Sequence, residues 1–98
     1  MKKVIYSVAK YGKTVSKITG IGYVTDEDLI IAAVSKNGKP YVRIFEDCIK
    51  HCYKVTNRTD EFKGDITEIH EVEIETKNGN YDTREIEVEY NIWFKYAD

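Results

Sequence analysis

The sequence predicts an all-β, mainly antiparallel fold, and three observations support this prediction. The 98 residues include 12 Ile, 9 Val and 8 Thr but a single Leu, and β-branched side chains pack better on a pleated sheet than in a helix. Apolar and polar residues alternate along residues 85–96, which is the period of a half-buried strand. Two Asn-Gly dipeptides, typical of hairpin turns, separate apolar segments. We expect a small barrel or sandwich of about six or seven strands.

The length allows one β-rich domain over residues 1–98. No apolar run approaches the roughly 20 residues of a membrane-spanning helix, and no cleavage pattern follows the basic start at Met1–Lys3. We therefore expect a cytoplasmic protein. A composition rich in Lys, Ile, Tyr and Asn and poor in Ala and Pro suggests an AT-rich gene, as found in low-GC bacteria and their phages.

The first third of the chain predicts three strands. Residues 3–9 form the first and residues 14–25 the second, in which Gly20 and Gly22 mark a bend, a bulge or a close backbone approach. Residues 29–35 are nearly all apolar without alternation, which predicts a central strand that is covered on both faces.

Asn37-Gly38 predicts a hairpin with a two-residue loop. Pro40 lacks a backbone N–H, so the strand after the loop is expected at a sheet edge. The loop length fixes the expected partners, which are Lys36 with Lys39, Ser35 with Pro40, Val34 with Tyr41, Ala32 with Arg43, and Ile30 with Phe45.

The only helix candidate lies near residues 46–53. Apolar residues at helical spacing would give this segment one buried face, namely Phe45, Cys48, Ile49 and Cys52. The polar residues 56–64 predict a loop.

The last third of the chain predicts a long β-hairpin with arms at residues 66–77 and 83–96. A two-residue loop at Asn78-Gly79 would pair Ile74 with Thr83, which sets a core position against a surface position. Because a slip of one residue inverts the faces of a strand, we predict a longer loop across residues 78–82, or a bulge.

Charge is distributed unevenly, although the formal net charge is −2. Residues 1–45 hold eight Lys or Arg and three acidic residues, whereas residues 46–98 hold seven and fourteen. The hairpin would gather six glutamates on one face, with Trp93 in the same register, namely Glu71, Glu73, Glu75, Glu85, Glu87 and Glu89. One interpretation is a solvated outer face, whose charges keep the strand edge soluble and discourage pairing with another strand. The other is a docking surface that binds a basic partner or mimics the charge of a nucleic acid.

The basic half combines aromatic rings with Lys and Arg, the groups that bind nucleotides. The candidate residues for a small anionic ligand are Tyr11, Lys13, Lys17, Tyr41 and Arg43, with Arg58 and Arg84 from the second half. The alternative is that these are ordinary strand residues, because Tyr is frequent in sheets and Lys covers their edges. Direct binding of duplex nucleic acid is not expected.

Motifs for catalysis or cofactor binding are weak or incomplete. Gly12-Lys13-Thr14 resembles the end of a phosphate-binding loop, but Ser7 stands where the first glycine is required. Cys48, His51 and Cys52 could join His70 around zinc, yet a second Cys pair is missing, and buried thiols are the simpler interpretation. We therefore expect no cofactor, no metal and no enzymatic activity.

Three functional hypotheses remain. The first is a non-enzymatic phage or mobile-element accessory protein that sequesters a small anionic, nucleotide-like ligand. The second is a protein–protein inhibitor that presents the glutamates and Trp93 to a basic host protein. The third, a small hydrolase, ranks last because no nucleophile–base pair is evident. We expect a homodimer or higher oligomer, because so long a hairpin would project beyond the core of a small chain.

Overall fold

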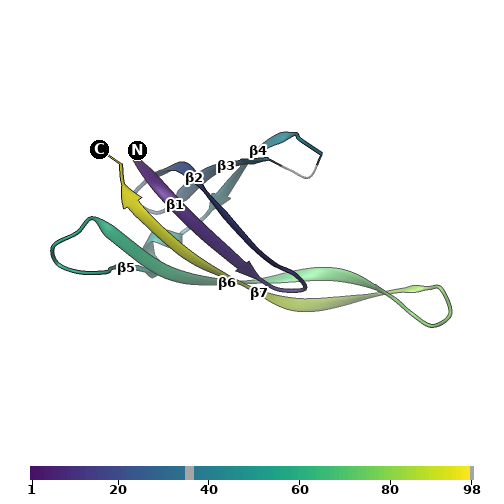
Figure 1. The fold of residues 1–98 in the computed structure, drawn as a ribbon. Helices are drawn as coiled ribbons and strands as arrows, with labels where there is room; N and C mark the ends of the chain where they lie inside the picture. The colour runs from purple at the N-terminus through teal and green to yellow at the C-terminus, as the bar shows by residue number, and fades with distance from the viewer. Residues whose placement is uncertain (35–36, 98) are drawn as a thin grey trace.

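The computed structural model describes residues 1–34 and 37–97 and confirms the all-β prediction. A single antiparallel sheet of seven strands has the order β4-β3-β2-β1-β7-β6-β5 (Figure 1). The only helix in the described ranges is the 3-10 turn η1 (Cys48–His51). The strands are β1 (Lys2–Tyr11), β2 (Val15–Val24), β3 (Leu29–Val34), β4 (Pro40–Phe45), β5 (Cys52–Lys54), β6 (Glu61–Glu75) and β7 (Tyr81–Tyr96).

The helix expected near residues 46–53 is reduced to the single turn η1. Asp47 adopts a left-handed conformation, with φ of 55°, between the end of β4 and η1. β5 begins directly after η1, so the segment is too short for the predicted α-helix. The loop expected over residues 56–64 ends at residue 60, because β6 begins at Glu61.

The register of β3 and β4 differs by one residue from the two-residue loop predicted at Asn37-Gly38. Arg43 pairs with Ile31 and Phe45 with Leu29, each partner lying one position earlier in β3 than predicted. Leu29, Ile31 and Phe45 are all buried, and this register places them on one face. The predicted register would divide them between two faces, which explains why a longer loop is favoured.

β4 is an edge strand, as Pro40 predicts, and Pro40 pairs with Val34. The predicted pairs of Ser35 with Pro40 and of Lys36 with Lys39 cannot be compared, because residues 35 and 36 lie outside the described residues. β3 lies between β2 and β4, but Ala32 on its outer face is exposed. The prediction that β3 is covered on both faces is therefore wrong for the single chain.

Two glycines in β2 let the sheet curl. β1 and β2 pair without a bulge, and the Tyr6 ring packs where side chains at Gly20 and Gly22 would stand. A Cβ atom on Gly22 would lie 2.6 Å from the carbonyl oxygen of Ile30. Of the three interpretations of this Gly pair, the structure therefore selects the close backbone approach.

Among the described residues, β2 and β3 pair only at Gly22–Val24 with Leu29–Ile31. The Tyr6 hydroxyl donates a hydrogen bond to the carbonyl oxygen of Ala32 at 3.4 Å, and burial raises the Tyr6 pKa. The curl brings Arg43 of β4 against β6 and β7, so the sheet is a partly open barrel.

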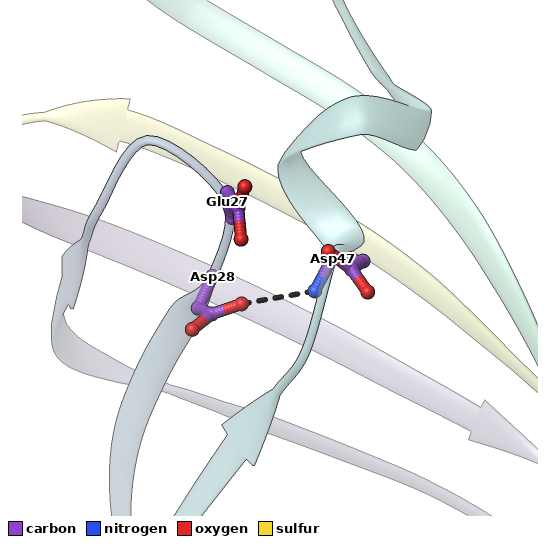
Figure 2. A group of neighbouring side chains, drawn as sticks. All are labelled: Glu27, Asp28 and Asp47. Carbon is purple, nitrogen blue, oxygen red and sulfur yellow. Dashed lines mark hydrogen bonds between the residues drawn. The ribbon is translucent and has the colours of Figure 1, made fainter.

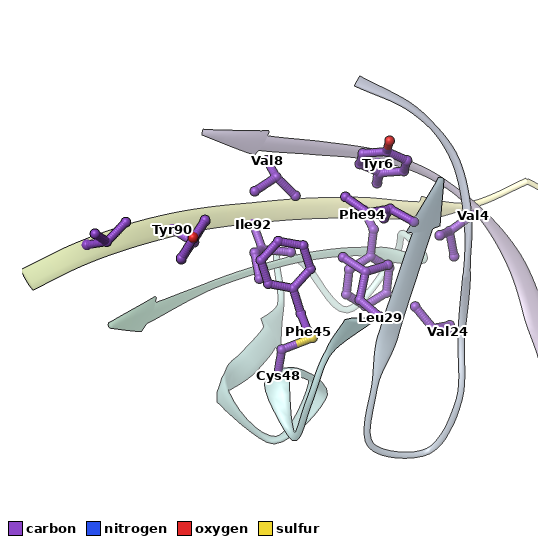
Figure 3. Packing of buried hydrophobic residues seen from close by; sticks show 12 residues of the cluster. Val4, Tyr6, Val8, Val24, Leu29, Phe45, Cys48, Tyr90, Ile92 and Phe94 are labelled. Carbon is purple, nitrogen blue, oxygen red and sulfur yellow. The ribbon is translucent and has the colours of Figure 1, made fainter. Parts of the chain in front are cut away.

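The core fills the inside of this curl (Figure 3). The stacked rings of Phe62 and Phe94 lie 4.9 Å apart, and Phe45 meets the edge of Tyr90. η1 packs against β6 at Gly64, where a Cβ atom would lie 2.6 Å from the carbonyl oxygen of His51. The buried apolar residues are Val4, Tyr6, Val8, Val24, Leu29, Ile31, Phe45, Cys48, Val88, Tyr90, Ile92 and Phe94.

β6 and β7 form the predicted long hairpin, with Glu75 paired to Tyr81. The loop is longer than two residues, as predicted, but it spans residues 76–80 rather than 78–82, and Gly79 has φ of 76°. β1 ends opposite Glu89, so beyond that point β7 pairs only with β6. We call this projection (residues 68–88) the arm, and Figure 1 shows it extending away from the paired chain termini.

Candidate functional site

A groove on the outer face of the sheet brings three aromatic rings and two lysines together. Its volume is about 390 Å³. The side chains that define this aromatic groove are those of Tyr11, Lys17, Tyr53, Lys63 and Trp93.

Strand register explains how the aromatic groove forms. Ser7 pairs with Trp93, Trp93 with Lys63, and Lys63 with Tyr53, so one row crosses β1, β7, β6 and β5. Lys17 lies in the next row, opposite Ala9. Alternate residues of a strand share a face, so these side chains all point away from the core. The small Ser7 and Ala9 side chains leave a depression between the larger ones.

Hydrogen bonds fix the polar groups around the aromatic groove. The Trp93 indole nitrogen donates to the Glu61 carboxylate, which orients the ring. Asn91 donates to the Asp65 carboxylate at 2.6 Å. Within residues 1–34 and 37–97, Lys17 and Lys63 make no ion pair. Two ammonium groups are thus available to an anion that stacks on the rings.

The structure divides the predicted ligand-binding residues. Tyr11 and Lys17 lie in the aromatic groove, whereas Tyr41 and Arg43 lie on the inner side of β4. The remaining three are scattered, with Lys13 in the β1–β2 turn, Arg58 in the turn before β6, and Arg84 on the arm. The seven residues therefore do not form one site.

The sequence pattern does not single out Tyr53 or Lys63, and the alternation places Trp93 only with the acidic face. Tyr53 falls in the segment predicted as helical, and Lys63 falls in the predicted loop. The only sequence signal for Lys63 is that the alternation of the hairpin extends backwards to Glu61. The Trp93 side chain is half-buried by its neighbours on the outer face.

Arg43 forms a second polar cluster at the seam between β4 and β6. Its guanidinium donates to the Glu68 carboxylate at 3.0 Å and to the Tyr90 hydroxyl at 3.1 Å, and it lies over the rings of Phe45 and Tyr90. His70 lies 3.5 Å from the same carboxylate. A groove of about 550 Å³ opens here. Because Glu68 neutralises Arg43, this seam offers an anion less charge than the aromatic groove does.

The six predicted glutamates share the outer face of β6 and β7. All are exposed, and Glu71 lies directly opposite Glu85. Glu87 pairs with Ile69, and Glu89 with Thr67. Five of the six are on the arm, and Glu89 stands at its base, beside Tyr11 of the aromatic groove. Like charges that face each other in this way destabilise a strand pair by a few tenths of a kcal/mol.

Three carboxylates gather at the start of η1 (Figure 2). Asp28 accepts a hydrogen bond from the backbone N–H of Asp47 at 2.9 Å. The Lys50 ammonium lies 3.0 Å from Asp47 and 3.9 Å from Glu27. These contacts fasten η1 to the β2–β3 turn, and Lys50 already supplies the positive charge.

The Cys and His residues do not assemble as a metal site in the described part of the chain, where the three carboxylates of Figure 2 are the only group close enough. Burial raises the pKa of Cys48 to about 12 and that of Cys52 to about 11. Zinc and electrophiles react with thiolates, so both raised pKa values oppose ligation and nucleophilic chemistry.

Alkaline pH should weaken the fold through Cys48. The unfolded thiol ionises near its ordinary pKa of 9.0, whereas the folded thiol keeps its proton up to about 12. The unfolded state thus binds fewer protons in this window, and stability should fall by up to about 1.4 kcal/mol per pH unit as pH rises. Urea unfolding of the wild-type chain and of Cys48→Ala measures this slope. Equal slopes would contradict the assignment to Cys48.

Comparison with protein-family models, with curated proteins and with solved structures finds no significant match. No helix in the described residues is long and apolar enough to cross a membrane.

Proposed function

We propose that the chain is a non-enzymatic binding protein that sequesters a small anionic, nucleotide-like ligand in the aromatic groove. The observation that supports this proposal is the row Trp93, Lys63 and Tyr53, flanked by Lys17 and Tyr11. A phage or mobile element would encode such a protein to remove a signalling nucleotide from its host.

The proposed recognition divides between stacking and charge. A base that stacks on an aromatic side chain contributes about 1–3 kcal/mol, without dependence on base identity. The Lys17 and Lys63 ammonium groups then receive the phosphate, as point charges rather than as a bidentate clamp. Asp65 lines the same groove, and its carboxylate accepts a hydrogen bond from Asn91, which stabilises the negative charge and occupies one of its oxygens.

A second candidate function is that of an inhibitor, in which the arm docks a basic host protein. The observation that favours it is the Glu71–Glu85 pair, in which two like charges face each other on the part of the hairpin that extends past the end of β1. Such an arrangement costs stability, so a binding role would account for its presence.

Charge reversal at separate places should distinguish the two candidates. In calorimetric titrations with AMP, a cyclic dinucleotide and a short oligothymidylate, we expect at least one of these probes to bind. Lys17→Glu with Lys63→Glu, and separately Trp93→Ala, should weaken that binding by roughly tenfold or more. Glu73→Lys with Glu87→Lys should leave it unchanged or strengthen it slightly, because these variants remove repulsion on the arm.

The groove variants and the arm variants also define which results would contradict each proposal. If no probe binds, or if the groove variants bind as the wild-type chain does, the ligand proposal is wrong. A basic protein that co-purifies with the wild-type chain, and is lost only from the Glu73→Lys, Glu87→Lys variant, would support the inhibitor instead. Circular dichroism of every variant verifies that the fold is retained.

A further inference from the structure

An apolar patch covers the outer face of β1 to β4. Ile5 pairs with Ile21, and Tyr23 pairs with Ile30, which in turn pairs with Ile44. Ile21 is 56% exposed and Ile44 is 50% exposed. Large apolar side chains that lie together on a surface mark an interaction site, whereas scattered ones do not. We call Ile5, Ile21, Tyr23, Ile30, Val42 and Ile44 the outer patch.

The surface area of the chain is large for its mass. The accessible surface is 7344 Å², and a compact monomer of 11.4 kDa is expected to expose about 5,800 Å². The radius of gyration is 15.9 Å, against about 12.6 Å for a compact domain of this length. The chain thus exposes about 1,500 Å² more than a compact domain would, and both the projecting arm and the open outer face contribute to this excess. A homodimer interface removes a comparable area from each partner.

We propose that the outer patch packs against the outer patch of a second copy of this chain. A face-to-face contact with two-fold symmetry buries the same residues on both copies. The two sheets should pack so that β1 of one copy runs opposite to β1 of the other. That orientation points the two acidic arms to opposite ends of the dimer, whereas a parallel orientation would place their glutamates side by side.

This proposal does not depend on the proposed ligand. The outer patch lies on β1 to β4, whereas most of the aromatic groove lies on β5, β6 and β7. The two surfaces share only strands β1 and β2, through different residues. A loss of dimerisation and a loss of ligand binding can therefore be measured separately.

Light scattering after size exclusion tests the proposal. The wild-type chain should have twice the chain mass of 11.4 kDa, and Ile21→Lys with Ile44→Lys should have the mass of one chain. Lysine is chosen because its aliphatic stem still covers the sheet while its ammonium opposes burial. The control is Ile69→Lys, which places the same change at a 59% exposed site on the arm and should leave the dimer intact.

Two results would overturn the proposal. One is a wild-type chain that is monomeric at every concentration up to the millimolar range. The other is an Ile21→Lys, Ile44→Lys variant that is folded and still dimeric. If the double variant does not fold, the single variant Val42→Lys replaces it, because Val42 is 66% exposed on an edge strand. A dimer that survives Val42→Lys and also Ile21→Lys alone would equally contradict the assignment.

Discussion

Phe94→Ala should remove a large part of the stability of the domain. Phe94 is 1% exposed, stacks on Phe62 and is among the largest fully buried side chains. Truncation of a buried Phe costs about 3–5 kcal/mol, because the lost burial is joined by a cavity that neighbours fill only in part. A domain of this size has a total stability of about 5–15 kcal/mol. Urea unfolding, at one protein concentration throughout, measures the loss.

The matched control is the adjacent residue. Trp93→Ala removes a larger ring, but from the outer face, where Trp93 is only half-buried. It should therefore cost less than Phe94→Ala, by at least about 1 kcal/mol, although more atoms are lost. An equal or larger loss for Trp93→Ala would show that the outer side of β7 is packed as tightly as the inner side. That outcome would also undermine the aromatic groove as an open site.

The contrast between these neighbours could be predicted from the sequence. Alternation along residues 85–96 assigns Phe94 to the core and Trp93 to the outer face, and the structure bears out both assignments. The six glutamates share a face for the same reason. Alternation is a local property of one strand, so it can be recognised without knowledge of the strand's neighbours.

The aromatic groove could not be predicted in this way, because it depends on which strands are neighbours. Ser7 and Trp93 come together only because β1 pairs with β7, the last strand of the chain. Tyr53 joins them through β5, a strand of three residues that carries no alternation. Charge counted along the sequence grouped Lys17 with Arg43, yet the sheet places these residues on opposite faces.

The β3–β4 register shows a different limit. Asn37-Gly38 is compatible with a two-residue loop, and local turn chemistry favours that loop. The observed register is shifted by one residue, and it groups Leu29, Ile31 and Phe45 on the buried face. The free energy gained by burying three large side chains exceeds the conformational preference of the turn, which is smaller than the gain from burying a single side chain. Tertiary packing thus sets the β3–β4 register, which the turn sequence alone does not determine.

Gly22→Ala should destabilise the domain by about 2 kcal/mol, because the added methyl group would meet backbone. Its Cβ atom would lie 2.6 Å from the carbonyl oxygen of Ile30, and a carbonyl in a strand cannot turn aside as a side chain can. β3 would have to move away from β2 at the place where the sheet curls. For a domain of this length, the expected fall in Tm is about 8–16 °C.

Gly20→Ala is the matched control, because Gly20 lies on the same face of β2, two residues earlier. Its Cβ atom would lie 3.2 Å from the Tyr6 hydroxyl oxygen, at the far end of a side chain that can shift slightly. Where the backbone is compatible, Gly→Ala stabilises a protein by about 0.4–1 kcal/mol, because it lowers the conformational entropy of the unfolded chain. This gain should offset the small shift of Tyr6, so Gly20→Ala should be nearly neutral. Because Tyr6 also bonds to Ala32, a large loss at Gly20 would mean that the Tyr6 ring, rather than the Gly22 contact, holds β3 and β4 over the core. Equal and small effects at both glycines would show that the sheet still curls when β2 and β3 lie further apart. The contact between Arg43 and Glu68 would then not depend on the close approach of β3 to β2.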